Sequence, residues 1–226
     1  MKKQTWIILF IIILTIHLAG IVLNNQWLSY ISKPMIVVLI GLYFLAQTDH
    51  TSPGFKKWIL GALIFSWTGD VLLLLQPENE IFFLLGLCAF LIAHIFYIFF
   101  FHHVRIKESV RSNTGLLLIA GVYYFSLIIL LFPHLGNMQI AVPVYGLVIS
   151  FMFLLALHML FIKNKMAGGW MMIGALLFII SDSLLAINKF YQPFDMAGLA
   201  IMATYGMAQL FIVEGAIKYI TSRDME

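Results

Sequence analysis

Two aspartates lie inside long apolar runs of this sequence, where carboxyl groups are rare. Asp70 and Asp182 each stand five residues before the end of a predicted membrane span, which is roughly 7–8 Å at about 1.5 Å rise per residue. A carboxylate near the bilayer centre costs about 2.5–3.5 kcal/mol on insertion scales, and such residues normally face the bundle interior. The two side chains are therefore expected at similar depth, and they form a paired-carboxylate site if their helices meet.

A pair of buried carboxyl groups is suited to general acid–base chemistry. Burial and a like-charged neighbour both favour the protonated form of one member of the pair. A protonated acid beside an ionised one can donate a proton to a substrate while the other assists water. The structural alternative is that each aspartate caps a helix break or bonds to a neighbouring hydroxyl. We favour function because ionisable residues within spans are usually functional.

Further polar residues within spans are candidates for the same cavity. His94 and Tyr97 lie one helical turn apart, so they share a face, and Tyr205 and Gln209 repeat that spacing. We expect His94 to take part in catalysis, and Lys33 to meet a phosphate as a point charge. Each residue also has a structural explanation, since such side chains bridge helices, anchor interfaces or snorkel. The predicted substrate-binding residues are Lys33, Ser66, Tyr97, Ser181, Ser183, Tyr205 and Gln209.

The elements that hold these residues follow from composition. Of 226 residues, 62% are hydrophobic and 10% are charged, and the mean hydropathy is +1.00. Soluble domains carry about 25% charged residues, so this chain has too little polar surface to face water. A bilayer core of about 30 Å needs roughly 17–25 apolar residues as helix. The sequence predicts an all-α membrane protein, a single-domain bundle of eight transmembrane helices over about 6–23, 28–45, 58–75, 81–101, 115–132, 140–162, 170–187 and 196–219.

The positive charges predict the orientation of the bundle. Of the 13 Lys and Arg residues, all except Lys33 and Lys189 fall on the side that holds both termini. The positive-inside rule then places both termini in the cytoplasm, and we expect the bacterial inner (plasma) membrane. Because no basic patch is present, nucleic acid is excluded as a partner. The oligomeric state, a homodimer included, stays open.

A weak internal sequence similarity suggests a parallel repeat of four plus four helices. Residues 61–65 and 69–73 of the third span resemble residues 174–178 and 181–185 of the seventh. Both spans run in the same direction, as a duplicated half would require.

Several chemical signals are missing from the sequence. It has no Gly-x-Ser-x-Gly elbow, no His-Glu-x-x-His and no phosphate-cradling loop, which argues against a serine lipase. Cys88 is the single cysteine, so neither a disulfide framework nor a cysteine zinc cluster can form. We predict no metal and no cofactor. Glu214 is expected to pair with Lys218 one turn on.

The order and spacing of these motifs resemble the YhhN-like lysoplasmalogenase family of multi-pass membrane enzymes. The resemblance implies eight spans and hydrolysis of the sn-1 vinyl-ether bond of a choline or ethanolamine lysoplasmalogen, which yields a fatty aldehyde and a glycerophospho-base. It carries over Asp70 and Asp182, with His94, Tyr97, Lys33, Tyr205 and Gln209 around them. The matching pieces are Lys33-Pro34, residues 66–70 (SWTGD), 93–97 (AHIFY), 180–185 (ISDSLL) and 204–209 (TYGMAQ).

The chemistry of vinyl ethers fits a pair of carboxyl groups. Protonation of the alkenyl carbon gives an oxocarbenium ion, which water then captures. Glycoside hydrolases use one carboxyl group as the acid and a second to assist water or stabilise positive charge. Our hypothesis gives these two roles to Asp70 and Asp182, in an order that the sequence leaves open.

Two other functions remain open from the sequence. Intramembrane carboxylates also build proton relays, so a proton-coupled transporter or permease is the first alternative. A metal-dependent membrane lipid hydrolase is the second, with Asp70, Asp182 and His94 as zinc ligands.

Overall fold

The computed structural model describes residues 2–51, 53–76 and 78–223, and this part of the chain is helical without strands. Eight of its helices are long and apolar enough to cross a membrane, so the predicted eight-helix bundle is confirmed and the protein is an integral, multi-pass membrane protein. The helices are α1 (Lys3–Val22), α2 (Gln26–Thr48), α3 (Pro53–Leu74), α4 (Ile81–Lys107), α5 (Thr114–Leu131), α6 (Ala141–His158), α7 (Lys165–Ala186) and α8 (Ala197–Arg223).

Short helical pieces extend or connect the long helices. Two 3-10 turns, η1 (Phe132–His134) and η2 (Gly136–Met138), join α5 to α6, and a third, η3 (Met159–Phe161), follows α6. The sequence predicts that the seventh span ends at residue 187. The helical structure continues beyond it as a π-helix, η4 (Ile187–Tyr191). π-Helical turns are often found beside functional sites.

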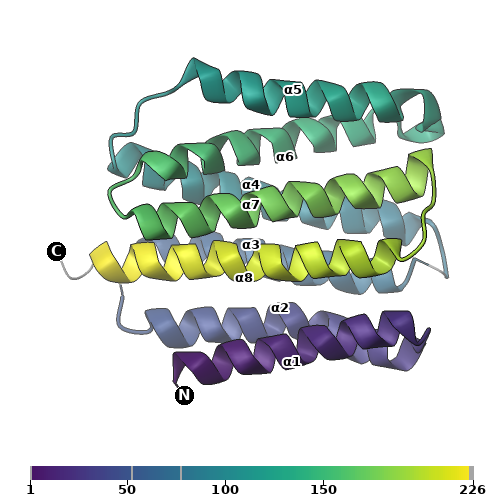
Figure 1. The fold of residues 1–226 in the computed structure, drawn as a ribbon, viewed down its shortest axis with the longest axis horizontal. Coiled ribbons are helices and arrows are strands. Elements are labelled where there is room, and N and C mark those ends of the chain that lie inside the picture. The colour runs from purple at the N-terminus through teal and green to yellow at the C-terminus, as the bar shows by residue number, and fades with distance from the viewer. Residues whose placement is uncertain (1, 52, 77, 224–226) are drawn as a thin grey trace.

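The helices run antiparallel to their chain neighbours, so both termini lie at one end of the bundle (Figure 1). We call this the terminal end. The opposite end, which carries the α1–α2, α3–α4, α5–α6 and α7–α8 connections, is the distal end. The expectation that the terminal end faces the cytoplasm stays a prediction.

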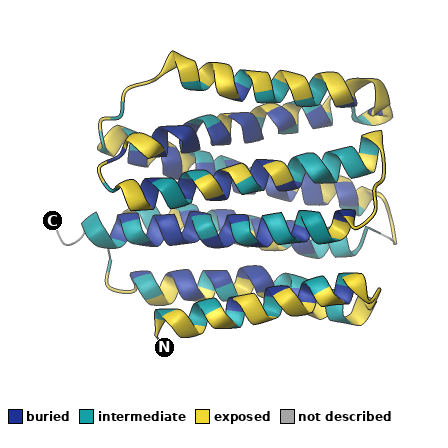
Figure 2. Ribbon diagram, in the orientation of Figure 1, coloured by how far each residue is buried: buried dark blue, intermediate teal, exposed yellow. Residues whose placement is uncertain are grey.

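Helix α8 is the most buried of the long helices, whereas α5 exposes most of its length (Figure 2). Helices α7 and α8 pack closely along each other, and this packing requires glycine. A Cβ at Gly174 would lie 2.6 Å from the backbone nitrogen of Ile212, and one at Gly215 would lie 2.8 Å from the carbonyl oxygen of Ala167. Small residues allow such close approach where lipid gives helices no hydrophobic drive to associate.

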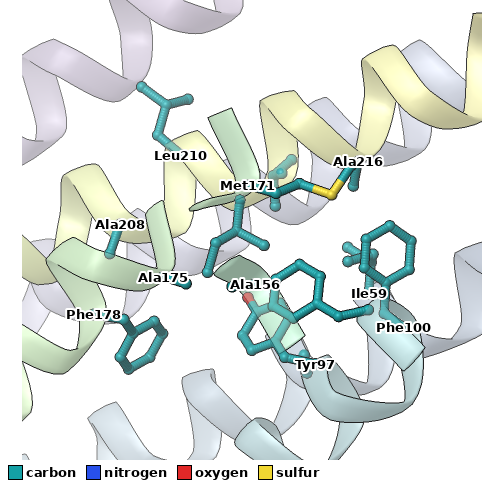
Figure 3. Packing of buried hydrophobic residues seen from close by; sticks show 14 of the residues in the cluster. Ile59, Tyr97, Phe100, Ala156, Met171, Ala175, Phe178, Ala208, Leu210 and Ala216 are labelled. Atoms are coloured by element: carbon teal, nitrogen blue, oxygen red, sulfur yellow. The ribbon is translucent and has the colours of Figure 1, made fainter. Parts of the chain in front are cut away.

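The interior of the bundle is filled by aromatic and aliphatic side chains from most of the helices. Figure 3 shows Tyr97 of α4 and Phe178 of α7 within this cluster, and their ring centroids lie 6.2 Å apart. Both rings are fully buried. Side chains of α4 and of α7, the helix that carries Asp182, therefore meet in the core.

Glu214 of α8 has partners on the first two helices. It forms an ion pair with Lys3 and accepts a 2.9 Å hydrogen bond from the Tyr43 hydroxyl. The prediction that Glu214 pairs with Lys218 is wrong, because this carboxylate is buried on the face of α8 that packs against α1 and α2.

Candidate active site

Asp70 lies in α3, four residues before the helix ends at Leu74, and is 1% exposed. Lys33 Nζ of α2 lies 3.8 Å from its Oδ1 atom. The hydroxyl of Tyr205 on α8 donates a 2.8 Å hydrogen bond to its Oδ2 atom. This carboxyl group thus has a cation on one oxygen and a hydrogen-bond donor on the other, which together compensate a buried negative charge.

A hydrogen-bonded network extends from Asp70 into the core through Gln209. The Gln209 amide nitrogen donates to Ser66 Oγ at 2.9 Å and to the Tyr205 hydroxyl at 3.4 Å. The hydroxyl of Tyr97 donates to the Gln209 amide oxygen at 2.5 Å. Because the amide uses its oxygen and its nitrogen at once, its orientation is set by these partners. The network holds Tyr205 in position against Asp70.

Asp182 lies in α7, four residues before Ala186, so its position in the helix matches that of Asp70 in α3. The Tyr145 hydroxyl of α6 donates to its Oδ2 atom at 2.6 Å. His94 Nε2 of α4 lies 3.6 Å from the same oxygen, which is longer than a hydrogen bond. This nitrogen is buried and has no hydrogen-bond partner. The imidazole therefore lies beside the Asp182 carboxyl group without a direct hydrogen bond to it.

One cavity of about 250 Å³ is lined by both aspartates. Helix α3 packs mainly against α4 and helix α7 mainly against α8, so the two carboxyl groups line this space from separate helix pairs. The cavity reaches the distal connections at Gln76 and Asn188. Its described polar lining consists of Lys33, Asp70, Gln76, Ser181, Asp182, Asn188 and Tyr205.

The structure brings most of the predicted site residues to this region. Five of them line the cavity: Lys33, Asp70, Ser181, Asp182 and Tyr205. Four others contact these residues or their hydrogen-bonded network from outside the cavity: Ser66, His94, Tyr97 and Gln209. Ser181 donates its hydroxyl to the carbonyl of Ile201 at 3.0 Å.

The Ser183 side chain points away from the cavity, toward α5. Its hydroxyl lies 3.0 Å from that of Tyr123 on α5 and donates to the carbonyl of Ile179 at 2.6 Å. Two residues advance a helix by about 200°, so Ser181 and Ser183 cannot both face one cavity.

Tyr145, Gln76 and Asn188 are polar neighbours of the site that the sequence analysis did not single out. Tyr145 stands four residues after α6 begins at Ala141, and Asp182 stands four residues before α7 ends. Both helix ends belong to the distal end of the bundle, so matching depth was the signal that could have found Tyr145. Asn188 lies in the π-helix, beyond the predicted span.

The donor set around the cavity favours proton transfer. Within residues 2–51, 53–76 and 78–223, no three His, Cys, Asp or Glu side chains are grouped so that they could hold a metal ion. His94 and Asp182 offer two ligands, whereas catalytic zinc sites use three protein ligands. Two carboxyl groups, two tyrosine hydroxyls, an imidazole and an ammonium group are instead arranged to bind, donate and accept protons.

Comparisons with known proteins find relatives over most of the chain. Residues 28–216 match the YhhN family. The chain is 31% identical to lysoplasmalogenase TMEM86B of Rattus norvegicus over 221 residues, 96% of this chain and 86% of that protein. It is 32% identical to lysoplasmalogenase TMEM86A of Homo sapiens over 207 residues, 86% of this chain and 80% of that protein. It is 30% identical to a Mycobacterium tuberculosis lysoplasmalogenase over 173 residues, 75% and 64% of the two chains. No solved structure matches it.

Proposed function

This chain belongs to the YhhN family, and we propose that it hydrolyses the sn-1 vinyl-ether bond of lysoplasmalogens. The products would be a fatty aldehyde and a glycerophospho-base. The observation that carries the proposal is a cavity that both Asp70 and Asp182 line, in a chain whose relatives are named lysoplasmalogenases.

We assign the acid to Asp182 and the charge-stabilising carboxylate to Asp70. Asp70 has the Lys33 ammonium group and the Tyr205 hydroxyl to compensate its negative charge. The contacts described for Asp182 are a hydroxyl and an imidazole. Since a buried carboxylate without a cation is costly, Asp182 is the member that carries the proton.

The reaction follows from a protonated Asp182 and an ionised Asp70. Asp182 gives its proton to the alkenyl carbon, and the double-bond electrons form the new C–H bond while the ether oxygen shares the positive charge. The Asp70 carboxylate stabilises that oxocarbenium ion and takes a proton from the attacking water. The resulting hemiacetal breaks its bond to the glycerol oxygen, and its hydroxyl proton passes to that oxygen. Proton transfer from Asp70 back to Asp182 through cavity water completes a cycle that consumes one water.

Neighbouring residues position these groups. Tyr205 and Tyr145 each hold one carboxyl oxygen through a hydroxyl, and His94 relays the proton that returns to Asp182. Lys33 supplies a point charge for the lipid phosphate. We place the protein in the bacterial inner membrane with the terminal end in the cytoplasm, as the positive charges favour.

The test is aldehyde release by purified protein in detergent. A lysoplasmalogen and a matched saturated lyso-ether lipid are compared for the wild type and for the Asp70→Asn and Asp182→Asn variants. We expect aldehyde from the alkenyl lipid alone and a loss of about 10²–10⁴-fold in each variant, the range of general acid–base catalysis. Folding is checked by thermal melting. Near-normal aldehyde release from both variants would overturn the paired-carboxyl mechanism, and substrate accumulation in sealed vesicles without aldehyde would favour a transporter.

A further inference from the structure

An apolar groove of about 510 Å³ runs along the membrane-facing seam between α2 and α3. Its α2 wall comes from Val37 to Leu45 and its α3 wall from Leu60 to Trp67. No charged residue lines it within the part of the chain that the structure describes. A linear hydrocarbon fits such a lining, and a polar ligand does not.

The groove lies one helical turn from two residues of the candidate active site. On α2, Val37 lies one turn beyond Lys33, and on α3, Trp67 lies one turn before Asp70. Residues three or four apart share a helix face, so each groove wall is followed, one turn toward the distal end, by a member of the Lys33–Asp70 ion pair. Closer to the distal end than the ion pair, the Tyr30 hydroxyl of α2 donates to the carbonyl of Leu74 on α3 at 3.3 Å. From the distal end inward, the seam therefore presents a hydrogen bond, an ion pair and then the groove.

We propose that the groove holds the aliphatic chain of a single-chain lipid whose polar end lies at the Lys33–Asp70 pair. The inference rests on the proposed function for the identity of the lipid as a lysolipid. From Val37 to Leu45 the groove extends about 12 Å along the helix, close to one leaflet, which is about half of the roughly 30 Å hydrocarbon core. From the Lys33–Asp70 pair the groove runs inward, starting at the middle of α2 and continuing toward the terminal end.

Gly41 leaves the groove open. A Cβ built on Gly41 has no atom within 4 Å, so a larger side chain can enter the groove without a clash near the backbone. Gly121 of α5 is a matched control, because its Cβ also meets nothing within 4 Å and it lies on a helix that does not line the groove. The pair Gly41→Phe and Gly121→Phe therefore separates groove filling from the general effect of a phenylalanine in a span.

The first experiment measures occupancy without turnover. A saturated lyso-ether lipid with a photoreactive group in mid-chain is crosslinked to the protein in detergent, and the labelled peptides are mapped. We expect labels at Leu42, Leu45 or Trp67 that unlabelled lyso-ether lipid competes away and two-chain phosphatidylcholine does not. Gly41→Phe should lower this labelling about tenfold, because it displaces chain methylenes from their contacts, and Gly121→Phe should leave it unchanged. Equal competition by phosphatidylcholine would overturn the proposal, since the groove would then hold any bilayer lipid.

The second experiment measures KM for lysoplasmalogens of decreasing chain length. Gly41→Phe should raise the long-chain KM about tenfold, with a penalty that shrinks as the chain is shortened. The same penalty at every length would overturn the chain assignment. The two proposals fail separately: specific crosslinking without any aldehyde from the wild type refutes the reaction, and aldehyde release without specific crosslinking refutes the groove.

Discussion

The Lys33 ammonium group lies 3.8 Å from Oδ1 of Asp70, and both side chains are largely or fully buried. This ion pair joins α2 to α3 in the distal half of the bundle. Asp182 lies at the matching position of α7, and its contacts in the described residues are with a hydroxyl and an imidazole instead. The two aspartates therefore occupy different electrostatic environments, which is the basis for giving them different roles.

Breaking this ion pair from one side should destabilise the protein. Lys33→Met leaves the Asp70 carboxylate buried without its cation, a change that costs about 3–5 kcal/mol in buried pairs. Adding Asp70→Asn removes the stranded charge, so the double variant should recover most of the stability without recovering activity. Thermal melting of the four proteins in one detergent measures the coupling. Purely additive changes in stability would show that the two charges do not interact.

The Tyr145 hydroxyl should matter for turnover far more than that of Tyr123. Tyr145→Phe removes the 2.6 Å hydrogen bond to Asp182, and hydrogen bonds to charged or reacting groups contribute about 1.5–3 kcal/mol, or roughly 10–100-fold in rate. Tyr123 bonds to Ser183 and the backbone of Ile179, so Tyr123→Phe should leave kcat near the wild-type value. Kinetics of aldehyde release, read as kcat and KM separately, distinguish the two variants. Equal losses in both would remove Tyr145 from the site.

The eight helices could be predicted because lipid forces apolar runs to satisfy their backbone hydrogen bonds within the segment. The depth of Asp70 and Asp182 followed from helix rise alone, and the structure places both on one cavity. The family resemblance, seen in the order of short motifs, is confirmed by the match over residues 28–216. The fold and the family could therefore be predicted because both depend on local patterns in the sequence.

Which helices pack together depends on side-chain fit across the bundle, which no local pattern records. Tyr145 was not singled out because its partner, Asp182, lies on another helix. Glu214 was paired with Lys218 one turn away, yet it bonds to Lys3 and Tyr43 from the start of the chain. The π-helix after α7 was likewise missed, because a polar connection and an extended helix end have similar sequences.

The Glu214 cluster should contribute to stability without contributing to turnover. It lies on the part of α8 that faces α1 and α2 toward the terminal end, away from the cavity. Glu214→Gln keeps an acceptor for the Tyr43 hydroxyl, whereas Glu214→Leu leaves that buried hydroxyl unpaired at a cost of about 1–3 kcal/mol. Melting temperature should therefore fall more for Glu214→Leu than for Glu214→Gln, with kcat unchanged in the folded fraction. A large loss of kcat in Glu214→Gln would connect this cluster to the chemistry.

The orientation of the bundle can be tested by labelling single cysteines in intact cells. In a Cys88→Ala background, Ser112→Cys places a thiol on the exposed α4–α5 connection at the terminal end, and Gln192→Cys places one on the exposed α7–α8 connection at the distal end. Because 11 of the 13 Lys and Arg residues lie on the terminal side, the positive-inside rule predicts that this side stays in the cytoplasm.

A membrane-impermeant maleimide should then label Gln192→Cys in intact cells, and Ser112→Cys only after the membrane is opened. Aldehyde release by each variant serves as the control for folding. The opposite labelling pattern would turn the distal end of the cavity toward the cytoplasm. The lipid substrate would then have to reach the Lys33–Asp70 pair from the cytoplasmic side.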